Sequence, residues 1–305
     1  MSDIYNEELH KKFFAIVGSP DEKKRISQAE ASRKMDLTAG VISAYKSKTY
    51  TGNVKRVEEK IEEFLQREER RHSMVVVPTA ETTTTTQVHR AITMAQDEVD
   101  IAVIVGEAGT GKTTAVKQYV RNTHSALLVE VDPSFSQTTL VHAIAEQVGL
   151  ETSGGTNAII ERIISALRTR DAVLIVDEAD YLSPASLELV RRVIHDKSNT
   201  GVVLTGLPRL EYKIKSLKND HQQLASRVGI LLKVAKMKKR DAEKILSGLW
   251  NDLPKDVVDE FIKTSNGSTR TLVKLMSRVH QLMKLNKAEK PDAEIIASAA
   301  ELLMR

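Results

Sequence analysis

Hydrophobic positions divide the chain into three stretches with different periodicities. From residue 1 to about 72, apolar residues recur at helical spacing, as at Leu9 and Phe13. Between residues 87 and 236, short runs of consecutive apolar residues alternate with amphipathic helical patterns. Residues 237–305 return to helical spacing alone. Strands that are apolar throughout and alternate with helices are typical of a parallel sheet covered on both faces. The sequence therefore predicts an α/β core between two helical domains.

The boundaries of the expected elements follow from these patterns. Strands are predicted over 101–105, 126–131, 172–176, 201–205 and 228–234. Core helices are predicted over 88–96, 114–121, 137–148, 159–168 and 184–195. Helices outside the core are predicted over 7–17, 26–35, 38–46, 53–69, 239–250, 255–265, 269–285 and 292–304. Residues 73–86 hold Pro78 and five consecutive threonines, so they offer little apolar surface and are expected to form a linker.

Two short helices joined by a turn are predicted inside the N-terminal domain, residues 1–72. Thr38 is suited to cap the second of them, and the small Ala31 allows the two helices to cross closely. The arrangement resembles the helix-turn-helix of phage repressor-type domains. That resemblance implies a DNA-facing surface formed by Ala39, Gly40, Ser43 and Lys46. This surface is short of Arg, Asn and Gln, which make bidentate base contacts, so reading of a base sequence is not expected. A helical bundle for protein contacts stays an alternative.

Composition narrows the classes of function. The chain has no cysteine, which excludes disulfides, thiolate metal sites and cysteine nucleophiles. No apolar run approaches membrane-spanning length, and the N-terminus lacks the basic start of a signal peptide, so a cytoplasmic protein with no membrane partner is expected. The net charge of +4 is compatible with nucleic-acid binding. Aromatic residues make up only 4%, which argues against base stacking as the main binding device.

Residues 106–113 read Gly-Glu-Ala-Gly-Thr-Gly-Lys-Thr, the G-x-x-x-x-G-K-[ST] pattern of a phosphate-binding P-loop, or Walker A motif. A predicted strand leads into it and a helical pattern leaves it. Glycines let the backbone turn tightly so that N–H groups point at phosphates, and the following helix adds its positive amino end. Lys112 should reach the β- and γ-phosphates of ATP, and the Thr113 hydroxyl should hold Mg²⁺. The expected ATP-binding residues are Gly106, Glu107, Ala108, Gly109, Thr110, Gly111, Lys112, Thr113, Thr114 and Asp177.

A second motif completes this chemistry. The apolar strand that begins at Val173 ends in two acids, Asp177 and Glu178, which is the Walker B form. Asp177 should bind Mg²⁺ through water, and Glu178 should polarise the water that attacks the γ-phosphate. The expected reaction is hydrolysis of ATP to ADP and phosphate.

Three further positions carry a resemblance to a family. Thr205 ends a strand where AAA+ ATPases keep sensor 1, Arg227 precedes the last strand where they keep an arginine finger, and residues 267–270 match the G-x-x-R of sensor 2. With the Walker motifs in this order, the chain resembles the AAA+ family. The resemblance implies that Thr205 orients the attacking water and that Arg227 reaches the γ-phosphate of a neighbouring subunit. It implies that Arg270 touches phosphates of its own subunit. Asparagine is usual at the Thr205 position, which leaves the hydrolysis rate open.

The helix-turn-helix pattern, the Asp-Glu-Ala-Asp-Tyr-Leu stretch at 177–182 and the compact C-terminal bundle narrow the resemblance further. Over its whole length the chain is similar to the target-selecting transposition ATPases of the Mu B type. That resemblance makes residues 87–236 the nucleotide-binding core and 237–305 a helical lid. It implies a homo-oligomeric filament or ring on duplex DNA, with little sequence preference. It also implies that the assembly activates a transposase and that hydrolysis releases it.

In such a filament, DNA would run through a central channel lined by two polar loops, 132–138 and 152–157. Neither loop carries a lysine, so contacts would rest on hydroxyls, backbone N–H groups and helix amino ends. The expected DNA-binding residues there are Ser134, Gln137, Thr138, Thr152, Thr156 and Asn157. Plain surface loops stay the alternative reading of both segments.

Two other functions fit the same motifs. A helicase loader or replication initiator shares the AAA+ core, and co-purification with a replicative helicase would favour it. An ATP-switched transcription regulator would use binding itself as its function, and a sequence-specific footprint from residues 1–72 would favour it. Sequence-independent filaments on duplex DNA would favour transposition.

Overall fold

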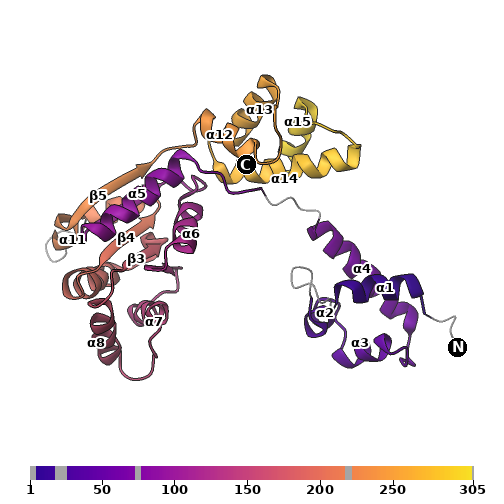
Figure 1. Ribbon diagram of the computed structural model, residues 1–305, viewed down its shortest axis with the longest axis horizontal. Helices are drawn as coiled ribbons and strands as arrows, with labels where there is room; N and C mark the ends of the chain where they lie inside the picture. The colour runs from indigo at the N-terminus through magenta and orange to yellow at the C-terminus, as the bar shows by residue number, and fades with distance from the viewer. Residues whose placement is uncertain (1–4, 18–25, 73–76, 217–221, 304–305) are drawn as a thin grey trace. The chain divides into compact units, whose positions relative to one another are not determined.

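The computed structural model describes residues 5–17, 26–72, 77–216 and 222–303. The chain forms two compact units, Met1–Val76 and Val77–Arg305 (Figure 1). Among the described residues, no helix is both long and apolar enough to cross a membrane.

The first unit is helical and consists of α1 (Glu7–Ile16), α2 (Gln28–Lys34), α3 (Ala39–Lys46) and α4 (Val54–His72). Its core is built from side chains on the inner faces of these helices, with Phe13, Ile42, Tyr45 and Ile61 fully buried. Thr38 caps α3 as predicted, because its hydroxyl accepts a hydrogen bond from the N–H of Val41 at 3.3 Å. The four residues predicted to face DNA, Ala39, Gly40, Ser43 and Lys46, are all exposed.

The second unit is built on a five-stranded parallel sheet, as the sequence predicted. Its strands are β1 (Ile101–Gly106), β2 (Ala126–Glu130), β3 (Val173–Asp177), β4 (Gly201–Gly206) and β5 (Val228–Val234). They are arranged in the order β2-β3-β4-β1-β5, and each pair is parallel. Because all strands run the same way, their carboxyl ends meet at one edge of the sheet, where polar residues can gather around a ligand.

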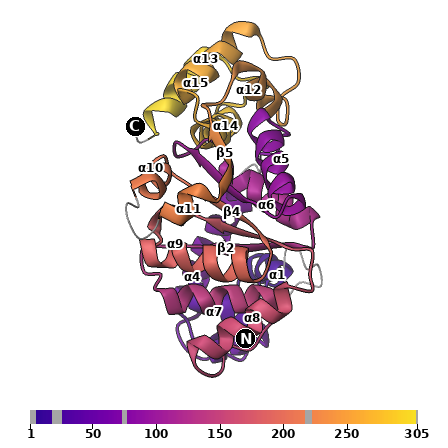
Figure 2. The ribbon, with the colours of Figure 1, turned by 90° about the vertical axis from the view of Figure 1, so that its left-hand side faces the viewer.

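Helices cover both faces of this sheet. On one face, α5 (Thr83–Asp97) and α6 (Lys112–Asn122) pack against Ala102 and Ile104 of β1. On the other lie α7 (Gln137–Val148), α8 (Thr156–Leu167), α9 (Pro184–Leu189) and the π-helical segment η3 (Val190–Lys197). Figure 2 shows α7, α8 and α9 next to one another on that face. Successive β1 residues alternate between the two hydrophobic clusters, so the strand is buried at every position.

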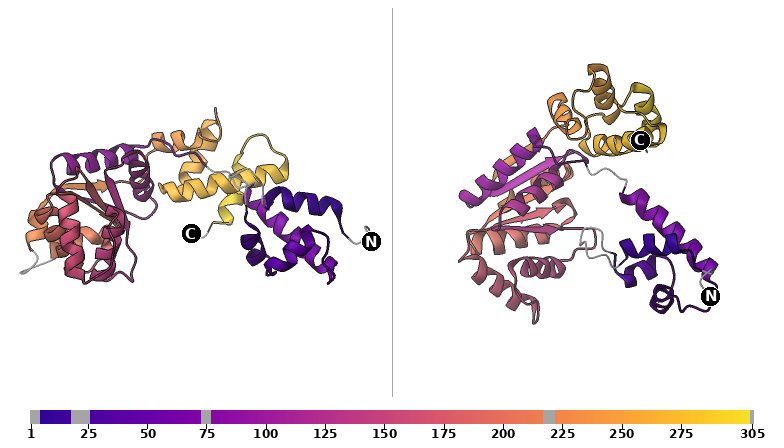
Figure 3. Two further views of the ribbon diagram at one scale, coloured as in Figure 1. Left: turned by 60° about the horizontal axis from the view of Figure 1, so that its bottom comes forward. Right: turned by 45° about the vertical axis from the view of Figure 1, so that its right-hand side comes forward.

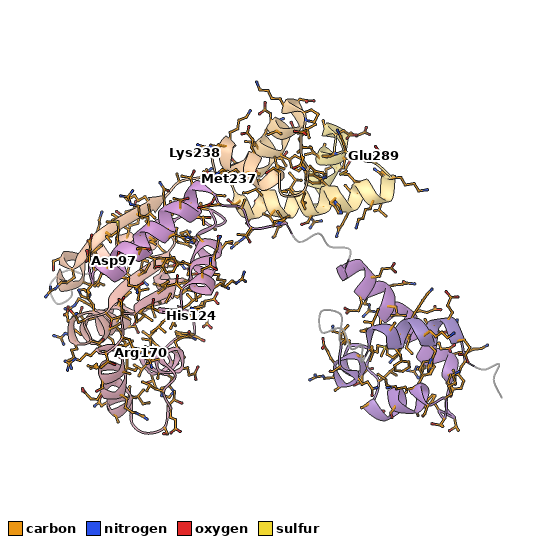
Figure 4. The ribbon with its side chains drawn as sticks, in the orientation of Figure 1. Asp97, His124, Arg170, Met237, Lys238 and Glu289 are labelled. Atoms are coloured by element: carbon orange, nitrogen blue, oxygen red, sulfur yellow. The ribbon has the colours of Figure 1, made fainter. Side chains whose placement is uncertain are left out.

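Two short helices between β4 and β5 were not predicted, namely α10 (Arg209–Ser216) and α11 (Gln222–Ser226). Helices α12 (Lys239–Leu246), α13 (Lys255–Ser265), α14 (Thr269–Asn286) and α15 (Ala293–Glu301) follow β5. Figure 3 shows these last helices gathered into a bundle, which has its own hydrophobic cluster around Phe261, Leu272 and Val279. In Figure 4, Met237 and Lys238 mark the passage from β5 into α12.

The end of the expected linker is part of a helix. Sequence analysis placed all five threonines at 82–86 in the linker, whereas α5 begins at Thr83. The Thr82 hydroxyl caps the helix by accepting from the N–H of Thr85 at 3.2 Å, and the side chains of Thr84 and Thr85 are buried. Asp241 of α12 adds a second cap, because its Oδ1 accepts from the N–H of Thr83 at 2.7 Å and from its hydroxyl at 3.0 Å. Threonine is a poor residue for a helix interior, and these caps account for its use here.

Candidate active site

The P-loop has the backbone geometry that its glycines predicted. It connects β1 to α6, and Gly109 and Gly111 adopt φ angles of +80° and +94°, which favour glycine. A Cβ atom on Gly109 would lie 2.5 Å from the Ser268 hydroxyl at the start of α14. The loop therefore requires glycine at this position both for its backbone conformation and for the close approach of the C-terminal bundle.

Lys112 points into this loop. Its side chain is buried, and its ammonium donates hydrogen bonds to the carbonyl oxygens of Gly106 at 2.7 Å and Glu107 at 3.1 Å. Burial lowers the pKa of Lys112, while the negative charges of Asp177 and Asp180 act in the opposite direction. A phosphate group at this loop would supply the charge that favours the protonated amine.

The two acids of the Walker B motif lie at the carboxyl end of β3 and differ in exposure. Asp177 is buried, and its Oδ1 accepts hydrogen bonds from the N–H of Glu178 at 3.0 Å and from the hydroxyl of Thr205. Glu178 is exposed and has a φ angle of +57°, which is uncommon for a residue with a side chain. Thr205 is fully buried at the end of β4, the neighbouring strand. Its hydroxyl proton is thus directed at the Asp177 carboxylate.

A cleft of about 530 Å³ brings most of the predicted residues together, and this volume is ordinary for a small-molecule site. The P-loop, Asp177 and Glu178 line one side of it. The rest of the lining comes from the start of the unit, the turn after β3, the end of β4 and the C-terminal bundle: Val77, Pro78, Thr79, Ala80, Thr82, Thr85, Asp180, Tyr181, Gly206, Leu207, Ile245, Thr269, Arg270, Val273 and Lys274. Apolar groups from the start of the unit and from the C-terminal bundle therefore face the phosphate-binding loop across one cavity.

Arg270 lies where the C-terminal bundle meets the P-loop. Its N–H donates to the carbonyl oxygen of Gly109 at 3.2 Å, and Ser268 caps the helix by accepting from the N–H of Thr271. The amino end of α14 thus faces the P-loop, and Arg270 belongs to the same cleft as Lys112.

Arg227 is not part of this cleft. Val228, the residue after it, pairs with Ile101 at the start of β1, whereas the P-loop follows Gly106 at the other end of that strand. From Ile101 to Gly106, β1 advances five residues, which is about 17 Å at 3.3 Å per residue. The Arg227 side chain is 58% exposed, and its Nε lies 3.9 Å from Asp196 Oδ1. The structure therefore places Arg227 at the opposite edge of the sheet from its own P-loop.

The residues predicted to contact DNA in the core lie around the amino ends of two helices. Gln137 and Thr138 open α7, and Thr156 and Asn157 open α8. The two helices pack together, and Arg170, just beyond α8, donates to the carbonyl oxygen of Val148 at the end of α7. Since their carboxyl ends are adjacent, the amino ends of these helices lie at the same end of the pair. Ser134 is engaged locally by Asp132, and Thr152 lies in the loop before α8.

Sequence reasoning missed one cation in this region. The Arg162 guanidinium, from the middle of α8, donates to the carbonyl oxygen of Ser153 in the loop 149–155. Arg162 lies outside the loop in sequence, so a scan of the loop itself could not find it. Its periodic position on α8, one turn and a half after Thr156, was the only signal available.

A magnesium ion fits this cleft only together with a nucleotide. Among the described residues, no group of three or more His, Asp or Glu side chains could hold a metal ion. Magnesium in nucleotide sites keeps several waters and takes one or two protein ligands besides the phosphates. A buried carboxylate, Asp177, and a hydroxyl, Thr113, in one cleft match that demand.

Comparisons with known proteins agree with this geometry. Residues 95–214 match the AAA domain family. The chain is 28% identical over 257 residues to the Mu-like prophage FluMu DNA transposition protein B of Haemophilus influenzae, covering 81% of this chain and 89% of that protein. It is 26% identical over 240 residues to the ATP-dependent target DNA activator B of Escherichia phage Mu, covering 75% of this chain and 74% of the relative.

Among solved structures, the ADP form of the Aeropyrum pernix ORC2 protein matches with a TM-score of 0.58 at 17% identity, covering 76% of this chain and 72% of that one. At that identity the likeness concerns the fold. Residues 95–214 thus match an AAA domain, and the chain resembles the B transposition proteins of Mu-like phages.

Proposed function

We propose that this protein is a DNA-dependent ATPase that assembles on duplex DNA, marks target sites for transposition and activates a transposase, with ATP hydrolysis driving release. The observation that carries the ATPase part is the single cleft that unites Lys112, Asp177, Glu178 and Arg270. The names of the relatives, a DNA transposition protein and a target DNA activator, support the transposition part.

Each residue of the cleft has a distinct role in the proposed reaction. Lys112 and Arg270 would neutralise phosphate charge, and Thr113 and Asp177 would hold Mg²⁺, which would supply further charge neutralisation at the phosphates. Glu178 polarises the attacking water. Thr205 acts through Asp177: with the N–H of Glu178, its hydroxyl fixes one carboxylate oxygen, so the other would be available to a metal ion. This role differs from the water-orienting role that the family resemblance implied.

The position of Arg227 supports a homo-oligomer. An exposed arginine at the opposite edge of the sheet from its own P-loop can complete the site of a neighbouring copy. A head-to-tail interface that repeats in this way generates a ring or a helical filament. The active sites would then be shared between copies of the chain.

Duplex DNA would be held mainly through its phosphates. The adjacent amino ends of α7 and α8 present backbone N–H groups and polar side chains, a common means of phosphate contact. The exposed face of α3 is proposed as a second contact, in the manner of a helix-turn-helix. Neither surface is rich in base-reading side chains, so binding should depend little on sequence.

Electron microscopy tests the proposal. The full-length protein, a slowly hydrolysed ATP analogue and duplex DNA of two unrelated sequences should give filaments of equal length, and omission of the nucleotide should abolish them. A footprint on one short sequence would instead favour an ATP-switched transcription regulator. Rings that form without DNA, together with stable binding to a replicative helicase, would favour a helicase loader.

A further inference from the structure

A buried carboxylate stands two residues after Glu178. Asp180 belongs to the 3₁₀ turn η2 (Ala179–Tyr181) and is 4% exposed. Its Oδ1 accepts from the N–H of Leu207 at 3.1 Å, and its Oδ2 accepts from Nε and Nη2 of Arg209, each at 2.6 Å. Leu207 and Arg209 follow β4, so one carboxylate ties the turn after β3 to the segment after the neighbouring strand.

Helix α10 holds the same turn at a second point. The Lys213 ammonium donates to the main-chain oxygens of Asp180 at 2.6 Å and Leu182 at 2.9 Å. The Arg209 guanidinium also lies over the Tyr181 ring, 4.9 Å from its centroid. The turn is therefore fixed through its side chain by Arg209 and through its backbone by Lys213.

These contacts constrain the positions of Glu178 and Thr205, the two residues that donate hydrogen bonds to Asp177. Glu178 has a positive φ angle, and such a conformation persists only where the surrounding structure holds it. On the other strand, Gly206 directly follows Thr205, and a Cβ atom on it would lie 2.5 Å from Asp180 Oδ1. Asp180 thus packs against the end of β4 while it anchors the turn that carries Glu178.

We propose that Asp180, Arg209 and Lys213 form a positioning unit that sets the place of Glu178 relative to Thr205 and Asp177, and so controls the hydrolysis step. Of the three, Asp180 itself lines the nucleotide cleft. The inference rests on the proposed ATPase function. Its physical basis is that charge-assisted, paired hydrogen bonds from an arginine to a buried carboxylate are strong and directional. Glu178 itself is exposed, so this unit, and not its side-chain packing, defines where it stands.

The test compares Asp180→Asn and Arg209→Gln with a matched control, Glu211→Gln. Glu211 is a buried acid on α10 that pairs with Lys215 and Lys233. For each full-length variant, we would measure kcat with DNA, the Kd of a fluorescent ATP analogue with Mg²⁺, and Tm.

In Asp180→Asn and Arg209→Gln, kcat should fall by roughly 10- to 100-fold, since displacing a catalytic group by ~1 Å costs about 10² in rate. In Arg209→Gln the Kd should stay within about threefold of wild type, because Lys112, Asp177, Arg270 and the negative charge of Asp180 near Lys112 are all unchanged. Glu211→Gln should keep the wild-type kcat.

Two further variants separate positioning from loss of structure. Arg209→Lys keeps a cation near Asp180 but loses the paired geometry, so it should recover only part of kcat. The double variant Asp180→Asn/Arg209→Gln should be no slower than the slower single variant, since both remove one interaction. If Asp180→Asn does not fold, Arg209→Gln alone tests the proposal. The Arg209 side chain is 53% exposed, so its replacement should not prevent folding.

The outcomes are distinct. A wild-type kcat in Arg209→Gln and Asp180→Asn would overturn the inference. So would a loss of ATP affinity in Arg209→Gln equal to its loss of kcat. Absence of ATP hydrolysis in the wild-type protein itself, in the same assay, would overturn the proposed function and not the positioning unit.

Discussion

At the residue scale, the carboxylate of Asp177 is the centre of the site, because three other functional groups act through it. Thr205 and the N–H of Glu178 donate to its Oδ1, and the charge of Asp177 favours the protonated form of Lys112. A carboxylate with one oxygen held in this way has little freedom to rotate. We therefore expect the affinity for Mg²⁺ to depend on a neighbour that does not itself touch the metal.

Thr205→Val tests this dependence, because it keeps the shape of the side chain and removes the hydroxyl. The variant should need several-fold more Mg²⁺ for half-maximal ATPase activity and should lose roughly 1–3 kcal/mol of stability, the usual cost of an unpaired buried group. Thr200→Val is the matched control, since Thr200 is equally buried and donates only to the carbonyl oxygen of Ser198. It should lower Tm without changing the Mg²⁺ requirement. Equal Mg²⁺ curves for the two variants would remove Thr205 from the site.

Site residues could be predicted from the sequence only where they belong to a short continuous motif. Spacing alone predicted that Lys112, Asp177 and Glu178 would share a site, since each belongs to a motif within one strand and its following loop, and the three line one cleft. The partner of Thr205 could not be predicted, because it lies 28 residues away and depends on β3 pairing with β4. The pairing of Asp180 with Arg209 could not be predicted for the same reason. In addition, Arg209 belongs to α10, a helix that the hydrophobic periodicity did not predict.

At the element scale, the connection between the C-terminal bundle and the sheet unit depends on the start of α5. Asp241 of α12 caps that helix at Thr83, and the Lys244 ammonium donates to the carbonyl oxygen of Glu81 at 3.0 Å. Residues on both sides of this connection, Thr82 and Ile245 among them, line the nucleotide cleft. The relative placement of α5 and α12 therefore shapes the cavity.

Asp241→Ala should weaken this connection. The substitution removes a buried acceptor from two donors, which should cost about 1–3 kcal/mol and lower Tm. ATP affinity should also fall, because the cleft loses the alignment of α5 with α12. Asp259→Ala is the control: Asp259 forms an exposed pair with Lys239 on the same bundle, and such pairs contribute ~0–1 kcal/mol. Thermal unfolding and nucleotide titration would check both, and equal behaviour of the two variants would contradict this account.

The same region shows where periodicity fails as a predictor of elements. All five strands were found, because each is a short run of mostly apolar residues. The first turn of α5 was assigned to a linker because its threonines offer little apolar surface. Besides the Thr82 cap, this turn is stabilised by Asp241, which lies 158 residues away. A cap supplied by a distant element leaves no local pattern.

At the scale of the whole molecule, the proposed contacts with DNA are to phosphates, and this has a measurable consequence. Each phosphate neutralised by the protein releases condensed counterions, so log K for DNA should fall linearly as log salt rises. Fluorescence anisotropy with two unrelated duplexes should give the same slope and nearly the same affinity. A preference for one duplex, with a shallow salt dependence, would point to base reading and against the proposed mode of binding.

The central claim for the assembly is that its active sites are shared between copies. Lys112→Ala removes the cation placed on the β- and γ-phosphates but keeps Arg227, while Arg227→Ala does the reverse. Each protein alone should hydrolyse ATP poorly, since an arginine finger is worth ~10³–10⁵ in rate and a P-loop without its lysine does not hold the nucleotide.

Mixing the two variants on duplex DNA is the most direct measurement. In a head-to-tail assembly each site has one neighbour. A complete site needs an Arg227→Ala copy, which keeps Lys112, beside a Lys112→Ala copy, which keeps Arg227. Random equimolar mixing should therefore complete about a quarter of the sites and restore about a quarter of the wild-type ATPase activity. Cross-linking between differently tagged copies would verify that mixed assemblies form. Recovered activity at that level is the result the account predicts. No recovery in assemblies that demonstrably contain both variants would mean that Arg227 does not serve a neighbour's site, and the shared active site would be wrong.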